Sequence, residues 1–199
     1  MPLLLNVVFL SIQKNKIKKM KKTLVITALS FCSIFAFAQK KVTTSAVINF
    51  DATTSIDSLP KASNKSVVAS LNTKTGEIAF EASVKNFSFS NPLMQDHFNG
   101  EYWMSSEKFP KATFKGKIMN LDRVNFSKSG KYEAQIEGEL NIKGVSKTFK
   151  TTASINAQGN KIMTSTKFNI TLADFGIEIP KIADGKVSQT PSLVVSAKF

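Results

Sequence analysis

Hydrophobic and polar residues alternate along most of the chain after Lys41. The clearest run spans Lys131 to Lys143, where small and apolar side chains fall on one face and every charged side chain falls on the other. A repeat of two residues is the period of a β-strand that has one buried and one solvated face. The same pattern recurs in runs that turn Phe80, Phe168 and Leu193 inward. The chain is therefore expected to be built from β-strands.

Turn residues separate these runs and divide the region into strands. Gly76, Gly130, Gly144 and Gly159 each stand in a short segment of the kind that tight turns need. We expect eight strands, at about 42–50, 64–72, 77–86, 111–121, 131–143, 147–157, 160–172 and 192–199. Eight antiparallel strands with one apolar face each can close into a β-barrel that holds one small ligand. A sandwich of two sheets would show the same alternation, so the pattern alone leaves both folds open.

The alternation breaks between Asn91 and Phe114, where the chain gathers its rarest side chains. Asn caps a helix N-terminus and Pro fits the first helical position, so Asn91-Pro92 predicts a helix that runs to about Asn99 and ends at Gly100. The side chains expected near one face of this helix are Met94, His97 and Phe98. This helical insert, near residues 91–104, would cover one mouth of a barrel. Its apolar residues would either fill that mouth as ordinary core or line a space for a ligand.

The first 38 residues have the pattern of a secretory signal preceded by an extension. Two lysines, at positions 21 and 22, form a basic start, and residues 23–37 follow as an uncharged apolar run. The small residues Ala36 and Ala38 suit cleavage after Ala38. The apolar run is too short to span a membrane. Translation from Met1 or from Met20 gives the same processed chain, a single domain at 39–199, which we expect in the periplasm or outside the cell.

Cysteine usage narrows the chemistry further. The only cysteine, Cys32, follows Phe31 and not the small residue that precedes the cysteine of a lipoprotein signal, so we expect it to leave with the signal. Residues 39–199 contain no other cysteine, which excludes a disulfide, a thiol nucleophile and a thiolate metal site from the processed chain. A segment of this length can bury enough apolar surface to be stabilised by its core alone.

The charge of residues 39–199 is moderately basic, with 21 basic and 14 acidic residues. Arg123 is the only arginine among them, whereas nucleic-acid sites favour arginine for its two-pronged contacts, so no nucleic-acid partner is expected. The lysines fall mostly on positions that should face water. They indicate a solvated basic surface, and weak contact with an anionic membrane surface is the alternative. The sequence does not indicate an oligomeric state.

Three stretches, in this order along the chain, resemble the YceI-like family. They are residues 94–98 (MQDHF) with 105–114 (SSEKFPKATF), residues 138–147 (GELNIKGVSK), and residues 168–170 (FNI) with 174–177 (DFGI). The resemblance covers nearly all of the expected domain. It implies an exported protein with a lipocalin-like β-barrel and an apolar tunnel that binds a lipid or polyisoprenoid. Lys143 stands where many members of the family have histidine, so no role of that histidine is carried over.

Candidate catalytic groups are few. His97 is the only histidine, and the chain has no G-x-S-x-G or H-E-x-x-H motif, no glycine-rich phosphate loop and no paired metal-ligand spacing. Asp96 stands beside His97, but neighbouring side chains on a helix point in different directions. We therefore expect neither an enzyme nor a metal or cofactor site, apart from a bound lipid such as an isoprenoid quinone.

Aromatic side chains are abundant in the expected domain, which keeps twelve of the sixteen phenylalanines. An apolar chain gains about 0.8 kcal/mol for each CH₂ that it buries, so a dry cavity is enough to bind it. The hypothesis is a carrier or reservoir for a long apolar lipid, with His97 nearest its polar head. The residues expected to bind it are Phe80, Val84, Met94, His97, Phe98, Trp103, Met104, Phe114, Ile136, Leu140, Ile142, Phe168 and Ile170. The alternative is a filled barrel without a ligand, acting as an envelope stress or interaction module.

Overall fold

Strands make up most of the described chain. The computed structural model describes residues 39–199, so the expected signal segment, its cleavage after Ala38 and the extension before it lie outside the described residues. The long strands are β1 (Lys40–Asp51), β2 (Lys61–Asn72), β3 (Glu77–Ser83), β5 (Lys111–Ile118), β6 (Gly130–Ile142), β7 (Val145–Gln158), β8 (Lys161–Asn169) and β9 (Ser192–Lys198). A two-residue strand, β4 (Ser88–Phe89), and the helix α2 (Pro92–Asn99) lie between β3 and β5. All eight expected strands are present.

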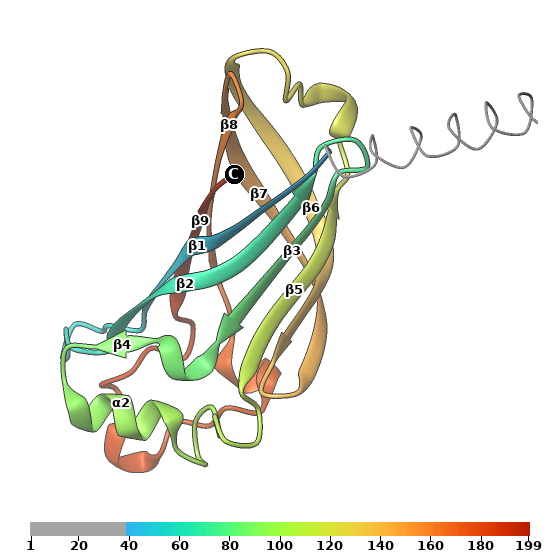
Figure 1. Cartoon of the computed structure of the whole chain (residues 1–199). Helices are drawn as coiled ribbons and strands as arrows, with labels where there is room; N and C mark the ends of the chain where they lie inside the picture. Colours follow the sequence, from blue (N-terminus) through green and yellow to red (C-terminus); the bar gives the residue numbers. More distant parts are fainter. Residues whose placement is uncertain (1–38) are drawn as a thin grey trace, which may run out of the picture. The chain divides into compact units, whose positions relative to one another are not determined.

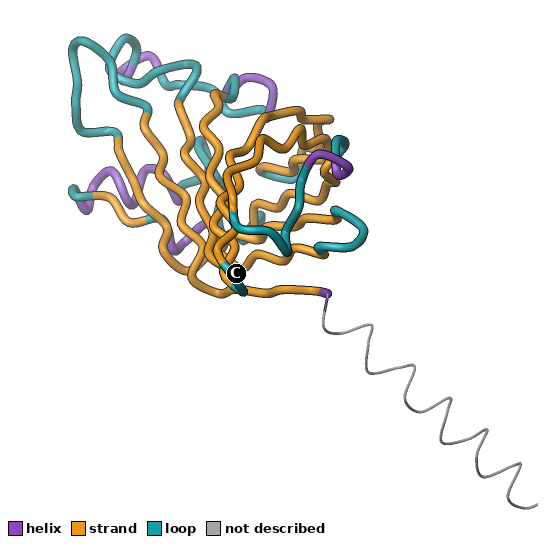
Figure 2. The backbone as a smooth tube through the Cα atoms, turned by 90° about the horizontal axis from the view of Figure 1, so that it is seen from above, coloured by secondary structure: helices purple, strands orange, loops and turns teal. Residues whose placement is uncertain are grey.

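The strands close into a barrel. Their order in the sheet is β1-β9-β8-β7-β6-β5-β3-β2-β4, and β1 also pairs with β2. This last pairing joins the two sides of the sheet into a ring, which Figure 2 shows from above. The short strand β4 adds to β2 outside the ring. The lipocalin-like barrel is thus confirmed and the two-sheet sandwich is excluded.

The β6–β7 hairpin is the longest ladder of the barrel and fixes its register. Ile142 pairs with Val145, so only Lys143 and Gly144 form the loop. Both have a positive φ, 52° and 79°, which is the geometry of a two-residue turn that matches the twist of the strands. From this turn the ladder continues to the pair Gly130 and Ala157 at the other end of the barrel.

Three strands end earlier than their alternation predicts. In each case the chain enters a single 3-10 turn, at Val84–Asn86, Leu121–Arg123 and Leu172–Phe175. The first of these turns is held by a hydrogen bond from the Val84 amide to the Pro110 carbonyl, at 2.9 Å. An inward apolar residue in such a turn continues the alternating pattern although the backbone has already left the barrel wall. The alternation therefore predicts a strand that is a few residues too long.

The helix α2 begins and ends where the sequence predicts. The Asn91 side chain accepts a hydrogen bond from the Leu93 amide, and the Gly100 amide donates to the carbonyls of Asp96 and His97. Figure 1 shows α2 and the chain around it at the lower end of the strands. The Gln95 side chain fastens the helix to β4, because its oxygen accepts from the Phe89 amide at 3.1 Å. Within residues 39–199, no helix is long and apolar enough to cross a membrane.

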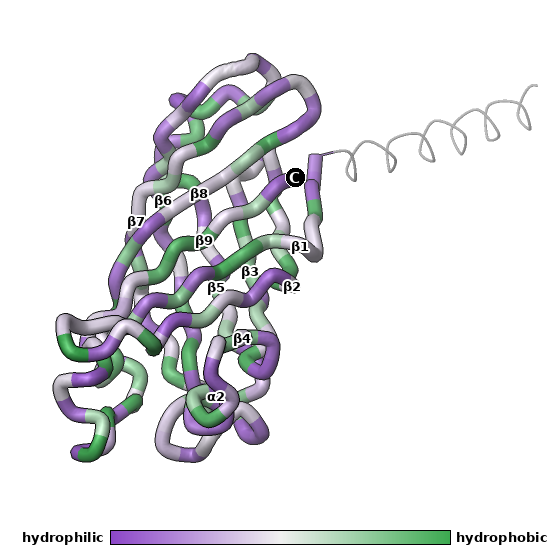
Figure 3. Tube along the Cα trace, turned by 90° about the vertical axis from the view of Figure 1, so that its left-hand side faces the viewer, coloured by the Kyte–Doolittle hydropathy of each residue, from purple (hydrophilic) through white to green (hydrophobic). Residues whose placement is uncertain are grey.

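The buried side chains form two clusters. One surrounds Phe98 and Leu172 near α2, and the other surrounds Leu71, Ile118 and Ile155 toward the opposite end. Figure 3 shows hydrophobic and hydrophilic positions alternating along the strands. Successive side chains of a strand point to opposite faces, so this alternation places the hydrophobic set inside the barrel. The end farther from α2 is closed by apolar core, which leaves the α2 half of the barrel as the place for a site.

Candidate functional site

An apolar cavity of about 130 Å³ lies inside the barrel in the half that α2 covers. Its wall comes from seven of the eight long strands, from α2 and from the loops at this end. Apart from threonines on β5, β7 and β8, every lining residue is apolar. No lining residue carries a charge, so the cavity offers burial to an apolar group and no partner to an ionic one.

Most of the residues predicted to bind a ligand do lie around this cavity. The ten that line it are Phe80, Phe98, Trp103, Met104, Phe114, Ile136, Leu140, Ile142, Phe168 and Ile170. They come from seven different elements or loops and are brought together by the closure of the sheet. The alternation predicted those on the strands, because an inward position on a closed barrel has only the interior to face, whereas Phe98, Trp103 and Met104 were predicted from the apolar insert.

Three predicted residues do not line the cavity. Val84 is fully buried within its 3-10 turn, Met94 is half-buried on α2, and His97 is exposed. The correction for His97 follows from the rotation of α2, which turns Phe98 into the barrel and the preceding residue, about 100° around the helix, toward solvent. His97 is therefore not positioned to meet the polar head of a molecule in the cavity.

Phe98 is the centre of an aromatic cluster that closes this end. Its ring centroid lies 5.0 Å from that of Phe89, 5.6 Å from Phe87, 6.1 Å from Phe50 and 6.3 Å from Trp103. The Phe98 side chain is only 6% exposed. Tilted ring pairs at these distances are favourable beyond the area they bury. The cluster gives the cavity an aromatic wall on the side of α2.

The loop after α2 turns Trp103 and Met104 toward the cavity because it folds back onto the helix. The Met104 amide donates to the Phe98 carbonyl at 3.1 Å, and the Ser106 amide donates to the Asn99 carbonyl at 3.0 Å. Ser105, between them, has a positive φ of 45°, which makes the turn tight enough for both bonds. The dense insert is thus a cap whose inner surface lines the cavity.

The Phe114 ring owes its place in the cavity to two glycines. Gly116 and Gly138 face each other across β5 and β6. A Cβ atom on Gly116 would lie 2.5 Å from Phe114 Cζ, and one on Gly138 would lie 2.8 Å from it. The ring therefore occupies the space that side chains at both positions would need, and glycine is the residue that leaves it free.

Sequence reasoning missed several lining residues. Phe50, Phe87 and Phe149 line the cavity, as do Thr151 and Thr166. Phe149 and Thr151 occupy alternate positions of an expected strand, so the alternation contains the signal for them. Phe87 gives no such signal, because it follows the 3-10 turn at Val84–Asn86 and lies outside any long strand.

The barrel wall has a seam between β7 and β8 beside the cavity. The two strands pair only from Ser154 with Ser165 to Gln158 with Lys161, so we define the β7–β8 seam as 145–153 of β7 facing 166–169 of β8. Where the seam meets the paired part of the two strands, the Thr166 hydroxyl donates to the Thr152 carbonyl at 2.8 Å. The hydroxyl oxygens of Thr166 and Thr151 lie 2.9 Å apart. Next to these threonines, the rings of Phe149 and Phe168 pack across the seam in a tilted arrangement, with centroids 4.6 Å apart and planes inclined by 56°.

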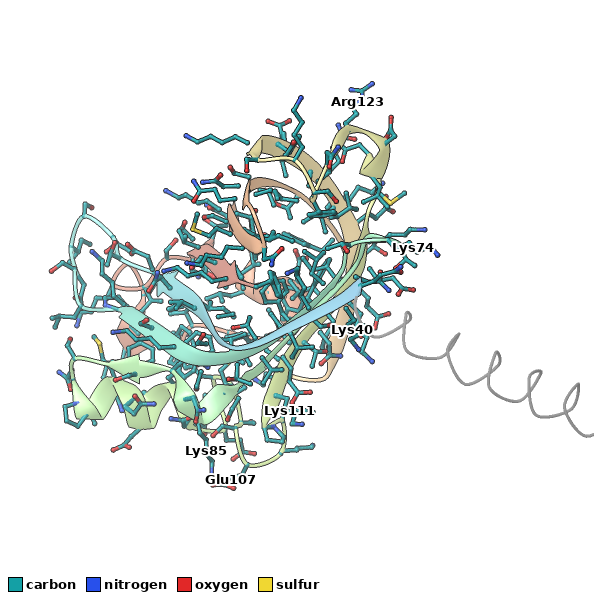
Figure 4. All side chains as sticks on the ribbon, turned by 45° about the horizontal axis from the view of Figure 1, so that its top comes forward. Lys40, Lys74, Lys85, Glu107, Lys111 and Arg123 are labelled. Carbon is teal, nitrogen blue, oxygen red and sulfur yellow. The ribbon has the colours of Figure 1, made fainter. Side chains whose placement is uncertain are left out.

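Charged side chains lie on the outside of the barrel. Figure 4 shows Lys74 and Arg123 projecting outward and Lys85 beside Glu107. Burial raises the pKa of the Asp51 carboxyl, but hydrogen bonds from the Thr53 hydroxyl and amide and the charge of Lys61 outweigh it and hold the pKa below its ordinary value of 3.8. Among the described residues, no group of three histidines, cysteines or carboxylates is arranged to hold a metal ion.

Comparison with known proteins identifies the relatives of this barrel. A polyisoprenoid binding domain from Saccharophagus degradans, implicated in plant cell wall breakdown, matches it with a TM-score of 0.69 and 14% identity, over 80% of this chain and 97% of that domain. BcnA from Burkholderia cenocepacia gives a TM-score of 0.67 and 15% identity, over 80% and 99% of the two chains. A YceI protein from Campylobacter jejuni gives 0.50 and 20%, over 67% and 79%. At these identities the three structures support the fold alone.

The sequence comparisons complete the assignment. No curated protein matches the chain. The model of the YceI-like domain, in contrast, matches residues 28–199, which include every strand of the barrel. The chain therefore belongs to the YceI-like domain family.

Proposed function

We propose that this protein binds an apolar lipid, of the polyisoprenoid or isoprenoid quinone class, by enclosing part of its chain in the barrel. The observation that carries the proposal is the uncharged, aromatic-walled cavity of about 130 Å³ inside the α2 half of the barrel. Membership of the YceI-like domain family supports it, as does the similarity to a domain described as polyisoprenoid binding. The protein would act as a carrier or reservoir that keeps the chain out of water.

The size of the cavity defines what enters it. An engineered protein cavity of ~150 Å³ with a similar aliphatic and aromatic lining holds one benzene ring, which has six carbon atoms. The space of about 130 Å³ therefore accommodates roughly six carbon atoms of a chain. Each buried CH₂ contributes about 0.8 kcal/mol, so such a segment supplies several kcal/mol of binding free energy without any polar contact.

We also propose that the protein works outside the cytoplasm. Strand β1 begins at Lys40, so cleavage after Ala38 would leave every strand of the barrel in the processed chain. The test is the mass of the protein recovered from periplasmic and culture fractions. A first residue of Gln39 in these fractions would support export, and an uncleaved chain confined to the cytoplasm would contradict it.

The binding proposal is tested by extraction. The protein is purified without detergent, extracted with organic solvent, and the extract is analysed by mass spectrometry. We expect an isoprenoid or related apolar lipid in an amount comparable to that of the protein, or uptake of an added isoprenoid quinone by lipid-free protein. Recovery of no lipid together with no uptake would overturn the proposal and favour the interaction module without a ligand.

A further inference from the structure

A second, smaller void lies beyond the cavity in the filled half of the barrel. Its volume is about 20 Å³, and fully buried Leu71, Ile118 and Ile155 are among the residues around it. The two voids share the lining residues Ile78, Phe80, Ile136, Thr166 and Val195. These five residues form a layer between the voids, and we call them the partition.

The partition closes the barrel from several sides. It draws on β3, β6, β8 and β9, which lie around the ring and not along one side of it. Ile78 and Ile136 are almost fully buried, with 5% and 7% exposure. Phe80 packs against both core clusters, so its ring spans the boundary between the hollow and the filled half. A chain that enters the cavity therefore meets side chains and not open space at this depth.

We propose that the partition, through Phe80 and Ile136, is the floor of the lipid site and sets how many carbon atoms of a chain the barrel encloses. This inference rests on the proposed lipid-binding function. The cavity before the floor takes roughly six carbon atoms, and the second void beyond it has room for about one water-sized group. A longer chain keeps its excess carbons outside, where they gain little from burial.

Truncating the floor joins the two voids. Ile136→Ala removes three carbon atoms from a side chain that lines both, and the resulting opening leads from the cavity into the second void. Ile162→Ala is the matched control, because it removes the same atoms from a residue that is 1% exposed in the filled half and lines neither void. Both variants carry the cost of a core cavity, and only Ile136→Ala lengthens the site.

The experiment measures affinity against chain length. Unbranched primary alcohols of about three to twelve carbons, each below its solubility limit, compete with a fluorescent fatty probe for the full processed chain. In the unaltered protein we expect affinity to rise about fourfold per added CH₂, and then to level off near about six carbons. The levelling point is expected to move by about two or three carbons in Ile136→Ala and to stay in place in Ile162→Ala.

The possible outcomes distinguish a failure of the proposed floor from a failure of the proposed lipid-binding function. If neither the probe nor any alcohol binds, the proposed lipid-binding function fails. If the ligands bind but affinity rises without a levelling point, or Ile136→Ala levels off where the unaltered protein does, the floor is overturned and the function stands. Thermal unfolding verifies that each variant is folded. Phe80→Leu tests the same floor with a smaller loss of volume should Ile136→Ala fail to fold.

Discussion

At the scale of single residues, Phe98 joins the fold to the proposed site. Its ring packs against Phe87 and Phe89 at the helical end, and the same side chain lines the cavity. A charge at this position would stand among apolar side chains with no partner among the lining residues, and burying an unpaired carboxylate is costly. Position 98 therefore tests the cavity more sharply than any exposed position.

We expect Phe98→Asp to lower the amount of bound lipid several-fold and to reduce the free energy of unfolding by at least about 3 kcal/mol. The matched control is Phe126→Asp, which alters a half-buried phenylalanine of the filled half that lines no part of the cavity. Lipid per folded protein is measured by extraction and mass spectrometry, and stability is measured by urea unfolding. Equal lipid loss in both variants would contradict a direct role of Phe98 in the cavity wall.

The Asp51 carboxylate predicts a pH dependence of stability. Its pKa is lowered in the folded chain, so the unfolded chain binds its proton at a higher pH than the folded chain does. The stabilisation from Asp51 is complete above the ordinary pKa of 3.8 and is lost as the pH falls through the lowered folded value. The ion pair with Lys61, at 3.7 Å, is exposed to solvent, so the effect is small.

The measurement compares the urea midpoints of the unaltered protein and Asp51→Asn. We expect a lower midpoint for the variant at pH 6 and a difference that shrinks as the pH falls below about 4, because both chains then carry a neutral group at this position. A difference that does not depend on pH would show that the Asn side chain alters the turn by its shape and not by its charge.

His97 shows that the sequence does not predict how a helix is rotated about its own axis. The spacing of Met94, His97 and Phe98 defines a helix face, but the rotation of the helix about its axis depends on the contacts that it makes. Here the packing of Phe98 among aromatic rings and the bond from the Phe89 amide to Gln95 settle that rotation, and both partners lie on other elements. The helix itself was predictable because its caps are local.

At the scale of elements, the sequence predicted which strands exist and that they are antiparallel, but not how far each pair of strands stays hydrogen-bonded. The strand β7 has 14 residues and β8 has 9, yet only five residue pairs join them. The alternation does not predict the seam beside the cavity, because both strands keep an inward and an outward face where they are no longer paired. Within the seam, the Thr166 hydroxyl satisfies the Thr152 carbonyl, which has no ladder partner on β8.

This hydrogen bond makes Thr166→Val a test of the seam. The substitution preserves the shape of the side chain and removes the hydroxyl that bonds the Thr152 carbonyl, at a cost of about 0.5–1.5 kcal/mol because this bond is accessible to water. We expect faster amide exchange in β7 and β8 around the seam, together with faster lipid uptake and release. Exchange should stay unchanged at the end of the β6–β7 ladder near Gly130, which lies away from the seam. Thr148→Val, at an exposed position of β7, is the control. Uniform acceleration across the barrel would indicate global destabilisation in place of a local opening.

At the scale of the whole barrel, the described chain is neither a hollow tube nor a filled one. The sequence did not predict whether the interior is hollow or filled, because an inward apolar residue gives the same pattern whether or not side chains from the opposite strands contact it. Around Leu71, Ile118 and Ile155 the opposing side chains leave only the small void of about 20 Å³, whereas around Phe114, Leu140 and Phe168 they leave the cavity of about 130 Å³. The lipid-free barrel thus lacks, in one half, contacts that a bound chain would supply.

A bound chain should therefore raise the stability of the folded state. A ligand that binds only the folded chain adds about 2.7 kcal/mol at a concentration ~100 times its Kd, which for a domain of this size raises Tm by about 5–10 °C. We expect this rise with a ten-carbon primary alcohol, together with slower amide exchange around α2 and little change around Ile118 in the filled half. A sugar alcohol of similar size, which gains nothing from an apolar cavity, serves as the control and should leave Tm unchanged at the same concentrations. Because the ligand acts by completing the packing of the hollow half, protection that spread evenly over both halves would contradict binding in the cavity.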